Sequence, residues 1–169
     1  QLSPENLNSL DKFESKIVSF FVGRPNFLYT FMIFFDNYTN LLILIALGSL
    51  LILFSLKDKM KFFFAFISSV LSASIIIFLL KILFQRARPL ESLVSYSSFS
   101  FPSGHAAAMF ATLPVFVKKY PRFKYLFYAL SILVLYNRIY LGVHYISDLV
   151  FGAAIGYLIG WFFVKYSKI

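Results

Sequence analysis

The sequence predicts an all-α protein, a polytopic bundle of transmembrane helices in a single domain over residues 1–169. Sixty per cent of the residues are hydrophobic and 14% are charged, whereas soluble globular chains carry roughly 45–50% apolar and about 25% charged residues. Several apolar runs approach the roughly 20 residues that a membrane-crossing helix needs, and the alternating pattern of barrel strands is absent. A soluble fold could not bury this much apolar surface, so lipid is the expected solvent.

Five segments are expected to span the membrane. Four are long enough or nearly so, whereas 105–117 is short, and Pro114 within it is expected to kink the helix. The five predicted spans are residues 40–56, 62–84, 105–117, 123–141 and 145–164.

Residues 17–35 are also apolar, but Gly23, Arg24 and Pro25 interrupt them. We interpret this region as two amphipathic pieces that lie in the membrane interface, with an interrupted sixth span as the alternative. On this interpretation residues 1–39 form N-terminal interfacial helices and residues 40–169 form the bundle.

Basic residues gather in turns that five spans would place on one face of the membrane. Residues 57–61 contain three lysines, residues 118–124 contain four lysines or arginines, and residues 165–168 contain two lysines. The positive-inside rule makes this face cytoplasmic. The net charge of +9 is therefore expected to serve orientation or an anionic substrate rather than nucleic acid.

Six charged or titratable residues lie on or near the opposite, outer face. Each charge at membrane depth costs about 2.5–3.5 kcal/mol on insertion scales, so each needs a reason. Snorkelling of a long side chain to water explains any one of them, but it does not explain the set. The six residues are Lys81, Arg88, His105, Arg138, His144 and Asp148.

The first stretch of interest runs from Lys81 to Arg88 and is followed by Pro89. Seven residues make about two helical turns, so the two cations are expected to share a helix face, and Pro89 is expected to end the helix. Two fixed cations on one face suit a dianionic group such as phosphate.

The second stretch is Pro102-Ser103-Gly104-His105. Ser103 is a candidate N-cap, and Gly104 lets a ligand approach the backbone closely. The first-turn amides would then form an anion site beside His105. The alternative is an ordinary capped helix with a surface histidine.

The third stretch contains His144 and Asp148, four residues apart. If a helix has begun by Val143, the two side chains are neighbours on one face. An aspartate that accepts from one ring nitrogen leaves the other nitrogen as a nucleophile or base. The alternative is a buried hydrogen bond that only holds two helices together.

The three stretches, in this order, resemble the signature of the type 2 phosphatidic acid phosphatase (PAP2) superfamily. The family pattern is Lys-x6-Arg-Pro, then Pro-Ser-Gly-His, then Ser-Arg-x5-His-x3-Asp, and this chain follows it from Lys81 to Asp148. One position departs from it: Asn137 stands where the family usually has Ser. Because Asn also donates hydrogen bonds, we expect altered phosphate contacts or helix packing rather than lost activity.

The resemblance implies a membrane lipid phosphatase in residues 40–169. It makes His144 the nucleophile that forms a phosphohistidine, Asp148 the residue that orients it, and His105 the acid and then the base. No metal or other cofactor is expected. The groups that it implies for binding the phosphate oxygens are Lys81, Arg88, Ser103, Gly104 and Arg138.

The compact chain is similar to small bacterial envelope-lipid phosphatases, which implies a multi-pass protein of the inner membrane with its site facing the periplasm. Candidate substrates are lipid A 1-phosphate, undecaprenyl pyrophosphate and phosphatidylglycerophosphate; the oligomeric state stays open. A phosphotransferase that passes the phosphoryl group to another lipid is an alternative. From other classes, a small transporter and a haem protein with two axial histidines are the competing hypotheses.

Overall fold

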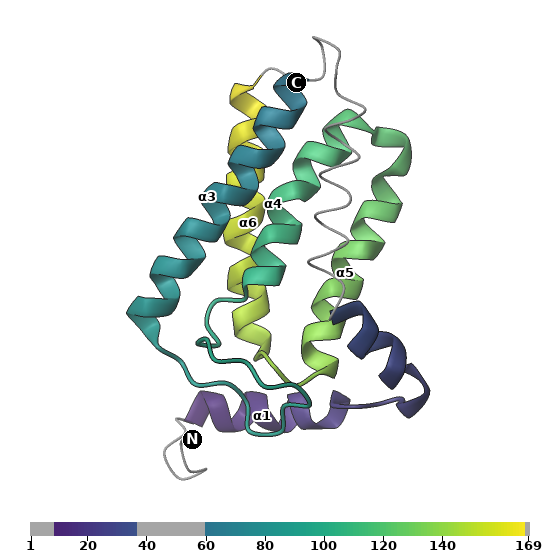
Figure 1. The fold of residues 1–169 in the computed structure, drawn as a ribbon, viewed down its shortest axis with the longest axis vertical. Helices are drawn as coiled ribbons and strands as arrows, with labels where there is room; N and C mark the ends of the chain where they lie inside the picture. Colours follow the sequence, from purple (N-terminus) through teal and green to yellow (C-terminus); the bar gives the residue numbers. More distant parts are fainter. Residues whose placement is uncertain (1–8, 37–59, 168–169) are drawn as a thin grey trace.

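A computed structural model describes residues 9–36 and 60–167, and within these ranges all regular secondary structure is helical. The predicted all-α class is therefore confirmed for the described residues. Four helices run side by side as a bundle, and helix α1 (Ser9–Phe21) lies across one of its ends (Figure 1). The bundle helices are α3 (Met60–Phe84), α4 (Gly104–Lys119), α5 (Lys124–Tyr140) and α6 (Ile146–Tyr166).

Two of the five predicted spans form helices that are both long and apolar enough to cross a membrane. These are α3 and α6, with mean hydropathies of 2.5 and 1.6 over their most apolar windows. The predicted spans 105–117 and 123–141 correspond to the shorter helices α4 and α5, of 16 and 17 residues. The predicted span 40–56 lies outside the described residues, so five clear spans are not confirmed.

The outward surface of α3 is apolar, as expected for a helix solvated by lipid. Leu71, Leu79 and Leu83 are 57%, 59% and 73% exposed. In water, a helix that exposes such side chains along its whole length would form a larger apolar patch than soluble monomers usually carry. Together with the hydropathy of α3 and α6, this arrangement indicates a membrane protein.

The N-terminal region is broken where the sequence predicts it. After α1, the chain turns through Gly23, whose φ of +65° is the left-handed conformation that favours glycine. It continues as a second helical piece over Asn26–Asp36, which begins with the 3-10 turn η2 (Asn26–Leu28) and is bent by 83° from α1. The two pieces amount to a candidate membrane span only when they are taken together. Their interfacial location remains a prediction.

Helices α4 and α6 approach so closely that only glycine fits at three positions of α6. A Cβ atom would lie 2.5 Å from the nearest backbone oxygen of α4 or its cap at Gly152, 2.1 Å at Gly156 and 2.2 Å at Gly160. No real side chain tolerates such distances. The glycine repeat therefore packs helices within the bundle, and this packing holds the start of α4 against the start of α6.

Two helix boundaries differ from the predicted ones. Helix α3 ends at Phe84 because Gln85 adopts a φ of +46° while its N–H still bonds to the carbonyl oxygen of Lys81. Arg88 therefore lies in a loop, and the prediction that it shares a helix face with Lys81 is wrong. Helix α6 begins at Ile146, so His144 precedes the helix rather than standing on it.

Candidate active site

The predicted site residues converge on one cavity of about 430 Å³ at the end of the bundle where α4 begins and α5 ends. Six of the eight line it: Lys81, Arg88, Gly104, His105, Arg138 and His144. Ser103 and Asp148 stand behind this layer, both fully buried. The rest of the lining is Ser74, Ile77, Phe78, Tyr96, Ser98 and Ala108.

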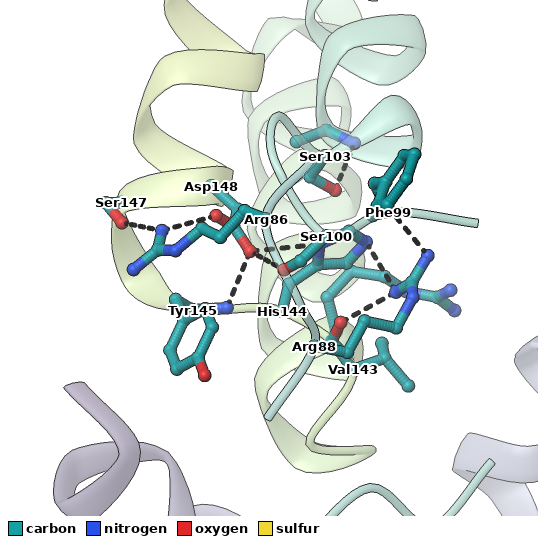
Figure 2. Close-up of polar contacts among 12 residues, drawn as sticks. Arg86, Arg88, Phe99, Ser100, Ser103, Val143, His144, Tyr145, Ser147 and Asp148 are labelled. Carbon is teal, nitrogen blue, oxygen red and sulfur yellow. Dashed lines mark hydrogen bonds and ion pairs between the residues drawn. The ribbon is translucent and has the colours of Figure 1, made fainter. Parts of the chain in front are cut away.

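His144 is held between a carboxylate and a guanidinium. Its Nδ1 lies 3.3 Å from Oδ2 of Asp148, and its Nε2 lies 3.4 Å from Nη1 of Arg88 (Figure 2). An aspartate accepting at Nδ1 favours the tautomer with its proton there, which leaves the lone pair on Nε2. That nitrogen is the one on the cavity side, beside a cation.

The Asp148 carboxylate is fixed by donors from several segments. Oδ2 accepts from the backbone N–H of Tyr145 at 2.9 Å and from the hydroxyl of Ser100, and Oδ1 accepts from Nη1 of Arg86 at 2.6 Å (Figure 2). The Tyr145 bond also satisfies a free amide at the start of α6. Because the carboxylate is buried, this set of donors fixes its orientation and thereby that of His144.

Burial keeps His144 uncharged. The side chain is 3% exposed, and burial lowers its pKa to about 4, although the hydrogen bond that it donates to Asp148 acts in the opposite direction. The charge of Arg88 lowers the pKa further. At neutral pH the imidazole is therefore a free base, as a nucleophile requires.

Arg88 is locked by the loop around it. Its Nε donates to the carbonyl oxygen of Ser98 at 2.9 Å, its Nη1 to the carbonyl oxygen of Val143 at 2.7 Å and its Nη2 to the Ser98 hydroxyl at 3.0 Å. The guanidinium also lies 4.7 Å from the centre of the Tyr96 ring. The cation is therefore preorganised at the cavity wall.

Arg138, in the last turn of α5, is the largest fully buried side chain of the described residues. Its Nη2 contacts the carboxylate of Asp36, and its Nη1 lies 3.5 Å from Nδ1 of His105. Within residues 9–36 and 60–167, its Nε–H has no hydrogen-bond partner. A buried donor without a partner costs about 1–3 kcal/mol.

The neighbour of Arg138, Asn137, connects the site to the N-terminal helical piece: its Oδ1 accepts a hydrogen bond from Nη2 of Arg138. Its Nδ2 donates to the carbonyl oxygen of Met32 at 3.0 Å, and it is fully buried. Asn137 therefore packs the Asn26–Asp36 piece against α5 through Met32 and also helps to hold the Arg138 guanidinium.

The remaining predicted residues occupy the other rim of the cavity. Ser103 caps α4 by accepting from the backbone N–H of Ala106 at 3.5 Å, which confirms the predicted N-cap. Gly104 and His105, the first two residues of α4, line the cavity and bring the positive end of the helix dipole to it. From α3, Lys81 contacts the carbonyl oxygen of Phe99.

Sequence reasoning missed the residues that support this layer. Arg86, Ser100 and Asp36 each contact a predicted site residue, and α1 contributes Asp11 and Glu14 through Arg86. One sequence feature could have pointed to Arg86: it lies two residues before Arg88, a predicted site residue. No spacing links the distant acidic residues to the site, because their partners are more than 60 positions away.

Fold and site together define a membrane helix bundle with a cationic cavity that holds two histidines. The family model described as the PAP2 superfamily matches residues 62–168. The chain belongs to this superfamily.

Individual proteins are similar over parts of the chain. Phosphatidylglycerophosphatase B of Bacillus subtilis is 37% identical over 93 residues, 48% of this chain and 45% of that protein. Lipid A 1-phosphatase of Rhizobium etli is 40% identical over 63 residues, 37% of this chain and 26% of that protein. These matches therefore span less than half of the length of either relative.

Among solved structures, the PAP2-type phosphatidylglycerolphosphate phosphatase of Bacillus subtilis superposes with a TM-score of 0.72. The superposition covers 96% of this chain and 88% of that one at 24% sequence identity. It shows that the two chains share a fold.

Proposed function

We propose that the protein is a membrane lipid phosphatase that hydrolyses a phosphomonoester or pyrophosphate on a lipid headgroup. The observation that carries the proposal is the convergence of three cations, Lys81, Arg88 and Arg138, with two imidazoles on one cavity. A single tetrahedral anion satisfies these groups. The competing hypotheses, a small transporter and a haem protein with two axial histidines, do not explain why three cations lie beside the histidines.

The chemistry begins at Nε2 of His144, whose lone pair attacks phosphorus while the bond to the leaving oxygen breaks. His105 gives its proton to that oxygen. In the second step His105 takes a proton from water, the water oxygen attacks phosphorus, and the N–P bond breaks to release phosphate and free His144. Asp148 stays ionised and holds the imidazole throughout.

Charge that develops on the non-bridging oxygens is stabilised by Lys81, Arg88 and Arg138. The amide of Gly104, on the helix start capped by Ser103, adds the dipole of α4. Positive charge is thus supplied by side chains and backbone, and we propose that no metal ion is required.

A lipid substrate is supported by the apolar wall of the cavity. Below Lys81 on α3 the lining continues through Phe78 and Ile77, and α4 contributes Ala108. The names of the relatives favour phosphatidylglycerophosphate and lipid A 1-phosphate, and undecaprenyl pyrophosphate has the same anionic chemistry.

The orientation follows from the basic residues. Lys118, Lys119 and Arg122 lie at the end of α4 and the following turn, opposite the end where α4 meets the cavity. By the positive-inside rule the cavity faces the periplasm of a bacterial inner membrane.

The test is phosphate release from each of the three lipids by the purified protein in detergent with EDTA. The proposal expects release from at least one lipid, loss of that release in His144→Ala, and inhibition by vanadate, a mimic of five-coordinate phosphorus. Release that requires an added metal, or that survives in His144→Ala, would contradict the proposed chemistry. A Soret band in the purified protein would favour the haem hypothesis.

A further inference from the structure

Arg86 joins three carboxylates from two helices that are distant in sequence. Its guanidinium contacts Asp11 and Glu14 of α1 and donates to Oδ1 of Asp148 at 2.6 Å. Nη1 also donates to the hydroxyl of Ser147 at 2.6 Å, and the guanidinium carbon lies 4.1 Å from the centre of the Tyr145 ring. Arg86 is absent from the cavity lining, so any effect that it has on the site acts through Asp148.

Helix α1 contacts Arg86 and the start of α6 through its polar face. Asp11 and Glu14 are buried, whereas Phe13 and Phe20 are each 63% exposed. This is the reverse of the arrangement that water would favour. The acidic residues face inward because Arg86 and the start of α6 are there to receive them.

Glu14 reaches α6 directly as well. Its Oε1 accepts from the backbone N–H of Ser147 at 2.8 Å, and its Oε2 accepts from the Ser147 hydroxyl at 2.8 Å. A carboxylate from α1 therefore satisfies a first-turn amide of α6 and lies at the positive end of its dipole. The first turn of α6 is the segment that carries Asp148.

We propose that Arg86 is a positioning residue that fixes Asp148, and through it His144, and that α1 completes the site by holding Arg86 with Asp11 and Glu14. The inference rests on the proposed function, because that function assigns a catalytic role to the Asp148–His144 pair. Among the described residues, Arg86 is the charged donor to Oδ1 of Asp148. Without it, only the Tyr145 amide and the Ser100 hydroxyl of the described residues, both on Oδ2, orient the carboxylate toward His144.

The kinetic test compares Arg86→Gln with Arg24→Gln, in which an exposed arginine outside the cavity lining is changed. Arg86→Gln should lower kcat by about 10–100-fold, by analogy with the outer-shell residues that orient metal-ligating side chains. The KM for the lipid and the inhibition constant of inorganic phosphate should stay within about two-fold, because the cavity lining is intact. Arg86→Lys should recover only part of kcat, since an ammonium cannot form the fork.

The link to α1 is tested by Glu14→Gln alone and combined with Arg86→Gln. If both act through one network, the double variant loses no more kcat than Arg86→Gln alone. An unchanged kcat in Arg86→Gln, a loss carried by KM or by phosphate binding, or additive losses in the double variant would overturn the inference.

Thermal melting separates this inference from the proposed function because it needs no substrate. Arg86→Gln and Glu14→Gln should each lower Tm. The Tm of the double variant should be no lower than that of the less stable single variant. If the Tm losses are not additive but the protein releases no phosphate, the network between α1 and Arg86 is supported and the phosphatase proposal is contradicted. Additive Tm losses would overturn the network itself.

Discussion

Nδ1 of His144 lies 3.3 Å from Oδ2 of Asp148 although His144 precedes the first residue of α6. The contact is therefore made by a loop that folds over the helix start, and helical periodicity does not produce it. Asp148 turns back toward this loop because the Tyr145 amide and the Ser100 hydroxyl both donate to the same oxygen. The site depends on these donors as much as on the four-residue spacing.

The depressed pKa of His144 predicts a stability change with pH. Burial lowers this pKa from 6.5 to about 4, so between these values the unfolded chain binds a proton that the folded chain does not. Stability therefore falls as pH falls from 6.5 to 4. The drop in Tm over this window should be larger for wild type than for His144→Asn. Equal drops would show that His144 titrates normally in the fold.

The close packing of α4 and α6 predicts that Gly156→Ala is strongly disruptive. The added Cβ would lie 2.1 Å from the carbonyl oxygen of Ala107, so the helices must separate at a cost of about 1–3 kcal/mol, as for overpacking elsewhere. Tm and kcat should both fall, because α4 carries His105 and α6 carries Asp148. The control is Ala154→Val on the exposed face of α6, which should change neither by much. A neutral Gly156→Ala would contradict the packing.

Asn137→Ala should lower stability more than it lowers catalysis. It removes the donor to the buried carbonyl oxygen of Met32, at a cost of about 1–3 kcal/mol. It also removes one acceptor of Arg138, but the Asp36 carboxylate still holds that guanidinium. Tm should fall, and kcat/KM measured well below the new Tm should stay within a few-fold of wild type. Asn137→Ser, which restores the residue usual in the family, should also remain active. A large loss of kcat/KM without a loss of stability would instead place Asn137 in phosphate binding.

Arg88→Ala should weaken phosphate binding and turnover together. The guanidinium lies 3.4 Å from Nε2 of His144 at the cavity wall, so its removal takes away ground-state and transition-state contacts alike. We expect kcat to fall by about 100-fold or more, as when one transition-state donor is removed, and inhibition by inorganic phosphate to weaken at least ten-fold. Arg122→Ala, at the far end of the bundle, is the control. Unchanged phosphate inhibition in Arg88→Ala would exclude it from the anion site.

The sequence predicts the all-helical class, and six of the eight site residues that it proposes line one cavity, because both depend on strong local signals. Apolar length predicts α3 and α6, and the cationic and imidazole residues lie at helix ends that meet at one cavity. The Ser103 cap is likewise local, since it needs only a hydroxyl before the first turn.

The missed features are non-local. The end of α3 depends on the backbone of Gln85, and nothing in its side chain marks the left-handed turn. The contacts of Arg86 with Asp11 and Glu14 bridge more than 70 positions, and the contact of Arg138 with Asp36 bridges more than 100. Such pairs are set by how helices pack, and a single sequence carries no periodic signal for them.

The most direct test of the central claim is to trap the phosphoryl group on the chain. Protein given a ³²P-labelled lipid phosphate and quenched in alkali should retain label, and trypsin should release it on the peptide 139–165, which contains His144 and excludes His105. His144→Ala should carry none. Label on the peptide 87–118, which contains His105, or no label during active turnover, would contradict His144 as the nucleophile.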